Sequence, residues 1–196
     1  MIILKKKDII LGIGFIILGI LIDQLIKIIV RVNMEVGKSI TIIGNFFYFS
    51  HVENTGAAWG GFSGYTVILI IVSIIILGFF IYMYRKINFK AKLIFSISLV
   101  MVISGTIGNL IDRIFFRSVT DYLDFIIFDY DFPVFNFADI LLVIGFFLFI
   151  IDMVFLNKDE DETTNEELVD EPKEELIEEN QEETVENDED TIKVEE

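Results

Sequence analysis

The chain has 196 residues, of which 54% are hydrophobic, and its mean hydropathy is +0.62. These apolar residues are gathered into long runs of Ile, Phe and Leu, whereas a soluble domain of this length mixes apolar with polar residues. The chain contains no cysteine, which excludes disulfides, thiolate catalysis and a metal site built from cysteines.

The formal net charge of −16 comes from the C-terminal end of the sequence. Residues 158–196 carry 20 acidic and three lysine side chains, whereas residues 1–157 carry 11 acidic and 12 basic ones. The C-terminal segment has no aromatic residue and few apolar ones, so it cannot bury enough surface to offset the entropy of ordering. We therefore expect a membrane domain at 1–157 and an acidic, disordered tail at 158–196.

Four segments approach the roughly 20 apolar residues that a helix needs to cross a bilayer, namely 9–30, 65–84, 93–111 and 134–156. Residues 67–77 contain one serine and do not alternate as the strands of a membrane barrel would, so helices are predicted. The first segment follows three lysines, but it contains Asp23 and Gln24 and lacks a small-x-small cleavage site. It is therefore predicted to be a retained first helix and not a cleaved signal peptide.

The distribution of Lys and Arg predicts the orientation, because cytoplasmic loops carry an excess of both. The N-terminus and the loop after the second span hold seven of them in two compact clusters, and the opposite side holds five. Both termini are then cytoplasmic, which agrees with an even number of spans. The first outer loop, residues 33–63, contains the aromatic stretch 45–54, which we expect to form a strand or two at the membrane interface.

Carboxylates gather at the predicted outer ends of the spans, where ionisable groups are costly and are therefore candidates for function. Asp121 lies ten residues past Ile111, and Asp139 is expected about one and a half turns into the fourth span. The short segment between the two is expected to bring them to one site. The ionisable residues at the outer ends of the spans or just beyond them include Asp23, Asp112, Arg113, Asp121, Asp124 and Asp139.

Two carboxylates held about 3 Å apart cannot both ionise, so they share a proton. One then acts as a base toward water while the other donates to the scissile carbonyl, as an aspartic protease requires. Periodicity does not choose between Asp121 and Asp124, because residues three apart would share a helical face. The zinc and serine classes of protease are excluded, because the chain has a single histidine, His51, and no G-x-S-x-G motif.

Two other classes of function are weighed against a protease. A proton-coupled transporter would place carboxylates near the middle of the membrane, but the central stretches 9–21, 66–80, 93–103 and 140–151 contain none. A non-enzymatic assembly or chaperone protein would tolerate the loss of either aspartate.

Five stretches within residues 8–155 resemble, in order, the motifs of the lipoprotein signal peptidase (signal peptidase II) family. They are DQLIK at 23–27, NTGAAWG at 54–60, GTIGNLIDR at 105–113, VTDYLDF at 119–125 and FPVFNFAD at 132–139. The resemblance implies an all-α integral membrane protein with four transmembrane helices, supplemented by a small extracytoplasmic β-cradle and a short interfacial helix. It also implies an aspartic endopeptidase that removes the signal peptide of bacterial prolipoproteins.

The resemblance further implies cleavage just before a diacylglyceryl-modified cysteine, at the outer face of the bacterial cytoplasmic membrane. The expected partners are the prolipoprotein and membrane lipids; no nucleic acid, metal or organic cofactor is expected. By motif, the catalytic pair maps to Asp121 and Asp139. The positions that shape the site or hold substrate map to Asp23, Asn54, Asn109, Arg113 and Asn136.

All of these residues except Asp121 also have a purely structural explanation. Asp23 can pair with Lys27, four residues further along the same helix. The asparagines can satisfy backbone groups at the ends of spans, and Arg113 can extend to the lipid headgroups. Asp139 can be a carboxylate favoured by the dipole at a helix N-terminus.

The remaining polar and small residues are assigned structural roles. Gly105 and Gly108 are expected to permit close helix packing. His51 is expected to be a solvated residue of a strand. Trp59 stands where the family commonly has Phe, and Thr120 where it commonly has Val, and both differences concern packing around the motifs.

Overall fold

The computed structural model describes residues 2–56 and 64–156, so the acidic tail expected at 158–196 lies outside the described residues. The four long helices are α1 (Ile2–Asn33), α2 (Thr66–Tyr84), α3 (Leu93–Phe116) and α4 (Phe137–Ile151), and a π-helical turn, Asp152–Leu156, follows α4. Residues Met1–Asp152 form one compact unit, and a second begins at Met153. The segments long and apolar enough to cross a membrane are Lys6–Asn33, Thr66–Tyr84, Leu93–Phe116 and Phe137–Leu156. The four spans predicted from hydropathy are therefore confirmed.

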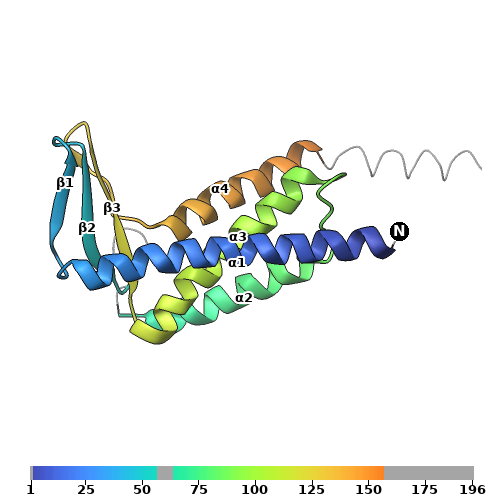
Figure 1. Cartoon of the computed structure of the whole chain (residues 1–196), viewed down its shortest axis with the longest axis horizontal. Coiled ribbons are helices and arrows are strands. Elements are labelled where there is room, and N and C mark those ends of the chain that lie inside the picture. Colours follow the sequence, from blue (N-terminus) through green and yellow to red (C-terminus); the bar gives the residue numbers. More distant parts are fainter. Residues whose placement is uncertain (1, 57–63, 157–196) are drawn as a thin grey trace, which may run out of the picture. The chain divides into compact units, whose positions relative to one another are not determined.

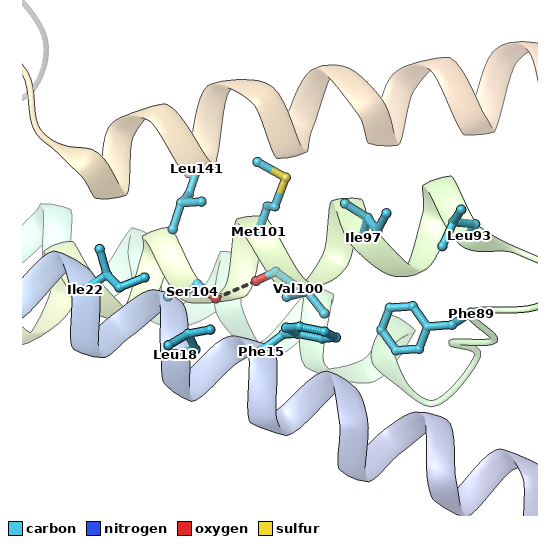
Figure 2. A pocket seen from close by; sticks show the side chains of 11 residues that line it. Phe15, Leu18, Ile22, Phe89, Leu93, Ile97, Val100, Met101, Ser104 and Leu141 are labelled. Atoms are coloured by element: carbon cyan, nitrogen blue, oxygen red, sulfur yellow. Dashed lines mark hydrogen bonds between the residues drawn. The ribbon is translucent and has the colours of Figure 1, made fainter.

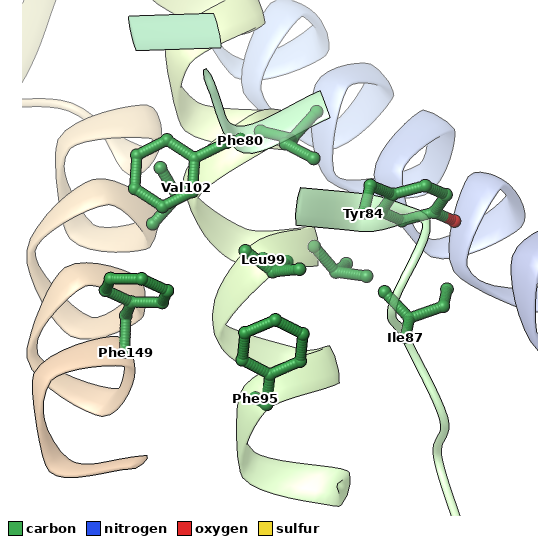
Figure 3. Packing of buried hydrophobic residues seen from close by; sticks show 9 residues of the cluster. Phe80, Tyr84, Ile87, Phe95, Leu99, Val102 and Phe149 are labelled. Carbon is green, nitrogen blue, oxygen red and sulfur yellow. The ribbon is translucent and has the colours of Figure 1, made fainter. Parts of the chain in front are cut away.

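Helix α3 lies at the centre of the bundle, with α1, α2 and α4 packed around it (Figure 1). Most of α3 is buried, whereas the other three helices turn most of their Ile, Val and Phe side chains outward. Such outward apolar surfaces suit a lipid environment. The core joins α2, α3 and α4 through edge-on contacts such as Phe80 with Phe149, whose ring centroids lie 5.4 Å apart (Figure 3).

An apolar cavity of about 450 Å³ lies between α1, α3 and α4 (Figure 2). Phe15 and Leu18 face it from α1, Met101 from α3 and Leu141 from α4. Its one hydroxyl, that of Ser104, donates to the backbone oxygen of Val100 at 2.7 Å. Because none of its lining residues is ionisable, this cavity has no acid or base to offer.

A four-stranded antiparallel sheet lies beyond one end of the helices, with the order β1-β2-β3-β4 (Figure 1). The strands are β1 (Ser39–Ile43), β2 (Phe47–Asn54), β3 (Val119–Ile127) and β4 (Tyr130–Asp131). Most of the aromatic stretch at 45–54 is a strand, because β2 covers Phe47–Asn54. The all-α class was too narrow, because β2 and β3, from two separate loops, pair with one another. No helix lies between β2 and α2 among the described residues, and 57–63 of that connection, including Trp59, fall outside them.

The prediction that His51 is a solvated strand residue was wrong. Its side chain is only 3% exposed, and its Nδ1 lies 2.8 Å from the backbone oxygen of Met34. The pairing of β2 with β3 shifts register between Phe49 and Val52, which marks a bulge at this position. The chain that follows α1 packs over the bulge through a hydrogen bond from Gly37 N to His51 O. The pattern of residues within the strand gives no sign of this covering segment, which is why His51 was expected to be solvated.

The connectivity places particular helix ends beside the sheet. Helix α1 leads into β1 and α3 into β3, while α4 begins shortly after β4. The N-terminus and the end of α4 consequently lie at the opposite end of the bundle (Figure 1). The polar motifs fall at the ends of α1, α3 and α4 that are next to the sheet.

Small residues allow α3 and α4 to approach closely, as the glycine pattern predicted. A Cβ atom added at Gly105 would collide with the backbone oxygen of Ala138, and one at Gly108 with the carboxylate of Asp23. On α4, a Cβ at Gly145 would lie 2.8 Å from the Cβ of Met101. Glycine at these positions sets the distance between the helices.

We expect Gly105→Ala to lower the free energy of unfolding by about 1–3 kcal/mol, because the added methyl group forces α3 away from the backbone of α4. Thermal or denaturant unfolding in detergent micelles measures this loss. Gly78→Ala is the matched control, because a Cβ there meets nothing within 4 Å. Equal stability of the two variants would contradict the packing argument.

Candidate active site

Asp121 is the third residue of β3 and pairs in register with Val52 of β2. Its side chain is almost fully buried, with 2% exposed. One carboxylate oxygen accepts a hydrogen bond from Asn136 Nδ2 at 2.6 Å and the other from Asn54 Nδ2 at 2.9 Å. The strand and the two amides therefore fix both the position and the rotation of this carboxylate.

Asp139 lies in the first turn of α4, not one and a half turns into the span as expected. Helix α4 begins at Phe137, after an extended Asn136 that serves as its N-cap. Asn136 Oδ1 accepts from the backbone N–H of Asp139 at 3.0 Å, and Asp139 Oδ2 accepts from that of Asn136 at 3.1 Å. This reciprocal pair is a capping box, so Asp139 also has the structural role of a carboxylate at a helix N-terminus.

Two asparagines connect the aspartates. Asn136 Nδ2 donates to Asp121, and it also lies 3.2 Å from the Oδ1 of Asn109. Asn109 in turn donates through its Nδ2 to Asp139 Oδ1 at 2.7 Å. The described structure thus links the carboxylates of β3 and α4 through two buried or half-buried amides.

Both aspartates line one cavity of about 550 Å³. Its polar side is formed by Asp121, Asp139, Asn54 and Arg113. The other lining residues are apolar, and most belong to the start of α4 and the segment before it: Val119, Phe132, Pro133, Val134, Phe135, Ile140, Leu142, Val143 and Ile144. The cavity can therefore hold a polar, reacting group against the carboxylates and an apolar chain along α4.

Burial raises the pKa of Asp121 to about 7, and the nearby carboxylate of Asp139 contributes to the rise. The amides of Asn54 and Asn136 act in the opposite direction, because they stabilise the ionised form. A carboxyl group with a pKa near neutrality can both hold and release a proton at neutral pH. This is the behaviour that general acid–base chemistry requires.

The sequence of the chain also matches known proteins. The family model for signal peptidase (SPase) II matches residues 15–155. The chain belongs to the signal peptidase II family.

Curated relatives agree with the match to signal peptidase II. The lipoprotein signal peptidase of Staphylococcus carnosus is 39% identical over 142 residues, which cover 72% of this chain and 89% of the relative. That of Clostridium acetobutylicum is 43% identical over 144 residues, which cover 73% and 93%. A bacterial membrane enzyme solved by the in meso method at 2.3 Å superposes with a TM-score of 0.67 at 36% identity, covering 73% of this chain and 87% of that one.

Arg113, the last residue of the GTIGNLIDR motif, lies on α3 and lines the site. Its Nη2 donates to the backbone oxygen of Gly56 at 3.2 Å, and its side chain lines the cavity that holds both aspartates. The contact joins α3 to the loop after β2. Lining this cavity is compatible with the expected role in holding substrate, which stays a prediction.

Asp124, which periodicity could not separate from Asp121, makes different contacts. Both residues lie on β3 and are three apart, so their side chains point to opposite faces of the sheet. Asp124 accepts a hydrogen bond from the hydroxyl of Ser50 on β2 and does not line the cavity. The notion of a shared helical face was wrong because this segment is a strand.

Asp23 is part of a buried cluster of charges that sequence reasoning captured only in part. Its predicted pair with Lys27 is present at 2.9 Å, and both side chains are buried. Lys27 also contacts Asp112 at 3.2 Å, and Asp112 contacts Arg31 at 2.8 Å. The spacing 23, 27 and 31 on α1 marks one helical face, and this was the signal available for Arg31, whereas Asp112 joins the cluster from α3.

Proposed function

We propose that this chain removes the signal peptide from prolipoproteins by cutting the bond just before a diacylglyceryl-modified cysteine. Asp121 and Asp139 serve as the catalytic pair of this aspartic endopeptidase. The observation that carries the proposal is the single cavity that is lined both by the two carboxylates, linked by Asn136 and Asn109, and by a set of apolar side chains, here called the hydrocarbon wall. Membership of the signal peptidase II family supports it.

The two carboxyl groups hold one proton between them before the reaction. The ionised carboxylate takes a proton from water as its oxygen attacks the scissile carbonyl, and the protonated one donates to the carbonyl oxygen. When the tetrahedral intermediate collapses, the C–N bond breaks, the departing amine receives a proton from the pair, and a hydroxyl of the intermediate gives its proton back to the pair as the new carboxyl group forms. The cysteine then becomes the new N-terminus, and the pair again holds one proton.

The neighbouring polar residues keep the pair in place and receive the substrate. Asn54 and Asn136 hold Asp121 in position, while Asn109 holds Asp139. Arg113 faces the same cavity, where its guanidinium can donate to a carbonyl of the lipid-modified substrate. Asp23 shapes the site by holding the backbone in the first turn of α4, since its Oδ1 accepts from the backbone N–H of Ala138 at 3.0 Å.

The hydrocarbon wall of the cavity fits the lipid part of such a substrate. Its apolar residues on α4, Ile140, Val143 and Ile144, belong to a helix that can span the membrane. Acyl chains can therefore stay beside this helix in lipid while the scissile bond lies against the carboxylates. Each CH₂ group buried in the bilayer contributes about 0.8 kcal/mol to anchoring, so the acyl chains hold the precursor in the membrane beside the site.

We further propose that the protein lies in the bacterial cytoplasmic membrane with both termini in the cytoplasm. The basic residues clustered before and between the spans support this orientation, and so does the position of the N-terminus and the end of α4 at one end of the bundle (Figure 1). The sheet and the two aspartates then lie at the outer face. The peptidase domain is residues 1–157, and residues 158–196 are an appended acidic tail.

The purified protein is tested on a prolipoprotein carrying diacylglyceryl on its cysteine and on the same precursor without the lipid. We expect at least a hundredfold faster cleavage of the lipidated form, since the acyl chains supply binding and alignment. Mass spectrometry is expected to place the modified cysteine at the N-terminus of the product. Cleavage elsewhere, or equal rates on both precursors, would refute the proposed substrate.

The pH dependence of cleavage follows from the pKa of Asp121, which is raised to about 7. Below this pH the pair retains its shared proton, and above it the proton is lost. We therefore expect kcat/KM to fall about tenfold per pH unit above roughly pH 7. Initial rates from pH 5 to 9 measure this, and a flat profile across pH 7 would exclude a required proton on the pair.

A further inference from the structure

We propose that Asp112 is a positioning residue of this peptidase, which fixes the backbone of β3 directly before Asp121. Asp112 lies on α3 and is fully buried, with 0% exposed. Its Oδ2 accepts a hydrogen bond from the backbone N–H of Thr120 at 3.1 Å. The inference rests on the proposed function, because it assigns Asp112 a role in holding one member of the catalytic pair.

Cationic partners on α1 hold Asp112 itself in place. Lys27 Nζ lies 3.2 Å from its Oδ2, and an Nη atom of Arg31 lies 2.8 Å from its Oδ1. Gln24 Nε2 also donates to that Oδ1 at 3.3 Å. A carboxylate with this many fixed partners cannot rotate, so the atom that accepts from Thr120 is held rigidly.

Arg31 reinforces the same point of the backbone from the edge of the cluster. Its Nε donates to the hydroxyl of Thr120 at 2.7 Å, and its guanidinium lies 3.9 Å from the ring centre of Phe116. The strand is therefore held just before Asp121 by the main chain and the side chain of Thr120 together. Arg31 lies on the same face of α1 as Lys27, and Asp112, which accepts from the backbone of Thr120, contacts both of these residues.

Asp23 fixes the backbone next to Asp139, as Asp112 does next to Asp121. Asp23 accepts from the backbone N–H of Ala138, the residue directly before Asp139. Lys27 Nζ lies 2.9 Å from Asp23 and 2.9 Å from Asn109 Oδ1, in addition to its contact with Asp112. One ammonium group thus uses its three protons to join the supports of both catalytic residues.

This arrangement controls the separation of the two aspartates. Asp112 and Asp23, with the ammonium of Lys27 between them, connect β3 to the start of α4, so a shift of either carboxylate changes the distance from Asp121 to Asp139. Sharing of a proton depends steeply on that distance. A misplacement of about 1 Å in a catalytic group can cost roughly a hundredfold in rate. Charge also balances within the cluster, because Lys27 and Arg31 neutralise the two carboxylates.

The test compares Asp112→Asn and Asp112→Glu with wild type on the lipidated prolipoprotein. We expect kcat to fall by about ten- to a hundredfold in both variants with KM changed by less than about threefold, because the catalytic pair and not the lipid-binding wall is displaced. The glutamate variant keeps the charge and moves the carboxylate by one carbon. If it behaves as wild type, charge and not position is at work, and the proposal is overturned.

A second readout needs no substrate. Carboxyl ¹³C NMR follows the titration of Asp121, whose pKa of about 7 depends in part on Asp139. Both Asp112 variants are expected to move this midpoint downward, toward the ordinary aspartate range, as the two carboxylates separate. An unchanged midpoint in both variants overturns the proposal. If wild type fails to cut the substrate while the variants still shift the midpoint, the proposed function fails and the positioning role stands.

Two further variants guard against a simple loss of folding. Arg31→Gln removes the outer partner, whose side chain is 18% exposed, and so perturbs the cluster least. We expect a several-fold fall in kcat and a smaller downward shift of the Asp121 midpoint. If the Asp112 variants do not fold, Arg31→Gln provides the test. Wild-type values of kcat and of the Asp121 midpoint in this variant would then overturn the proposal. Asp124→Asn is the matched control, because Asp124 lies outside the cavity and is expected to leave both readouts unchanged.

Discussion

Replacement of either Asp121 or Asp139 by asparagine is expected to lower kcat for signal-peptide cleavage by about 10²–10⁴-fold. Loss of a general acid or base typically has this effect, and asparagine can neither accept nor supply the shared proton. Both carboxylates line the same cavity and both take part in the proposed reaction. The remaining aspartate therefore cannot take over the role of the one that is lost. The expected losses are similar, and the double variant is expected to be scarcely worse than either single one, because the two residues act as one unit.

The asparagine variants also carry a structural cost that must be separated from the loss of chemistry. Each oxygen of Asp121 accepts from an amide, and Asp139 accepts from Asn109 and from the backbone of Asn136. An asparagine at either position turns one NH₂ group toward a donor, which costs about 1–3 kcal/mol in a buried site. Unfolding curves of each variant are therefore measured together with the rates.

Asp124→Asn is the control for the same substitution on the same strand. Asp124 accepts from the hydroxyl of Ser50, which can rotate to suit an amide, and it lies outside the cavity. We expect its kcat to stay within about twofold of wild type. A folded Asp121 or Asp139 variant that keeps more than about a tenth of the wild-type rate would rule out the assignment of the pair.

Lys27→Met is expected to produce the largest loss of stability, about 3–5 kcal/mol of unfolding free energy. Removing one member of a buried ion pair leaves its partner charged and without compensation. Lys27 is fully buried and contacts two carboxylates and one amide, so its loss affects Asp23, Asp112 and Asn109 together. Methionine fills a similar volume, which keeps cavity formation out of the comparison.

Unfolding of Lys27→Met in detergent micelles by heat or denaturant measures the effect. Lys38→Met is the matched control, because Lys38 is exposed in the segment before β1 and should change stability by less than about 0.5 kcal/mol. Adding Asp23→Asn to Lys27→Met removes the stranded charge and is expected to restore part of the loss. Additive losses in that double variant would contradict a coupled pair at Asp23 and Lys27.

Local patterns in the sequence were sufficient to predict the four helices and the end of the bundle at which the polar motifs gather. The apolar runs predicted four spans, and α2 begins and ends within a residue of the predicted 65–84. The fourth span was predicted from 134, but α4 begins at Phe137, because Asn136 caps it. That difference moves Asp139 from the second turn to the first.

Contacts between distant segments were beyond the reach of these patterns. The choice of Asp121 over Asp124 from geometry depends on β3 being a strand paired with β2, and these two strands are separated by more than 60 residues of chain. The burial of His51 depends on the segment after α1 that packs over the bulge in β2. Asp112 looked like one more acid at the end of a span, and its hydrogen bond to Thr120 forms only when β3 folds back beside α3.

The sequence by itself determined what the membrane requires: four apolar helices, polar residues kept to their ends, and glycines where α3 meets α4. These are local requirements, because each apolar helix must satisfy its own backbone hydrogen bonds in lipid. Only the tertiary structure decided which helices the glycines bring together and which polar ends meet. Asp121 and Asp139 reach one cavity through the pairing of β2 with β3, the cap at Asn136 and the buried charges around Lys27, all of them interactions between segments far apart in the chain.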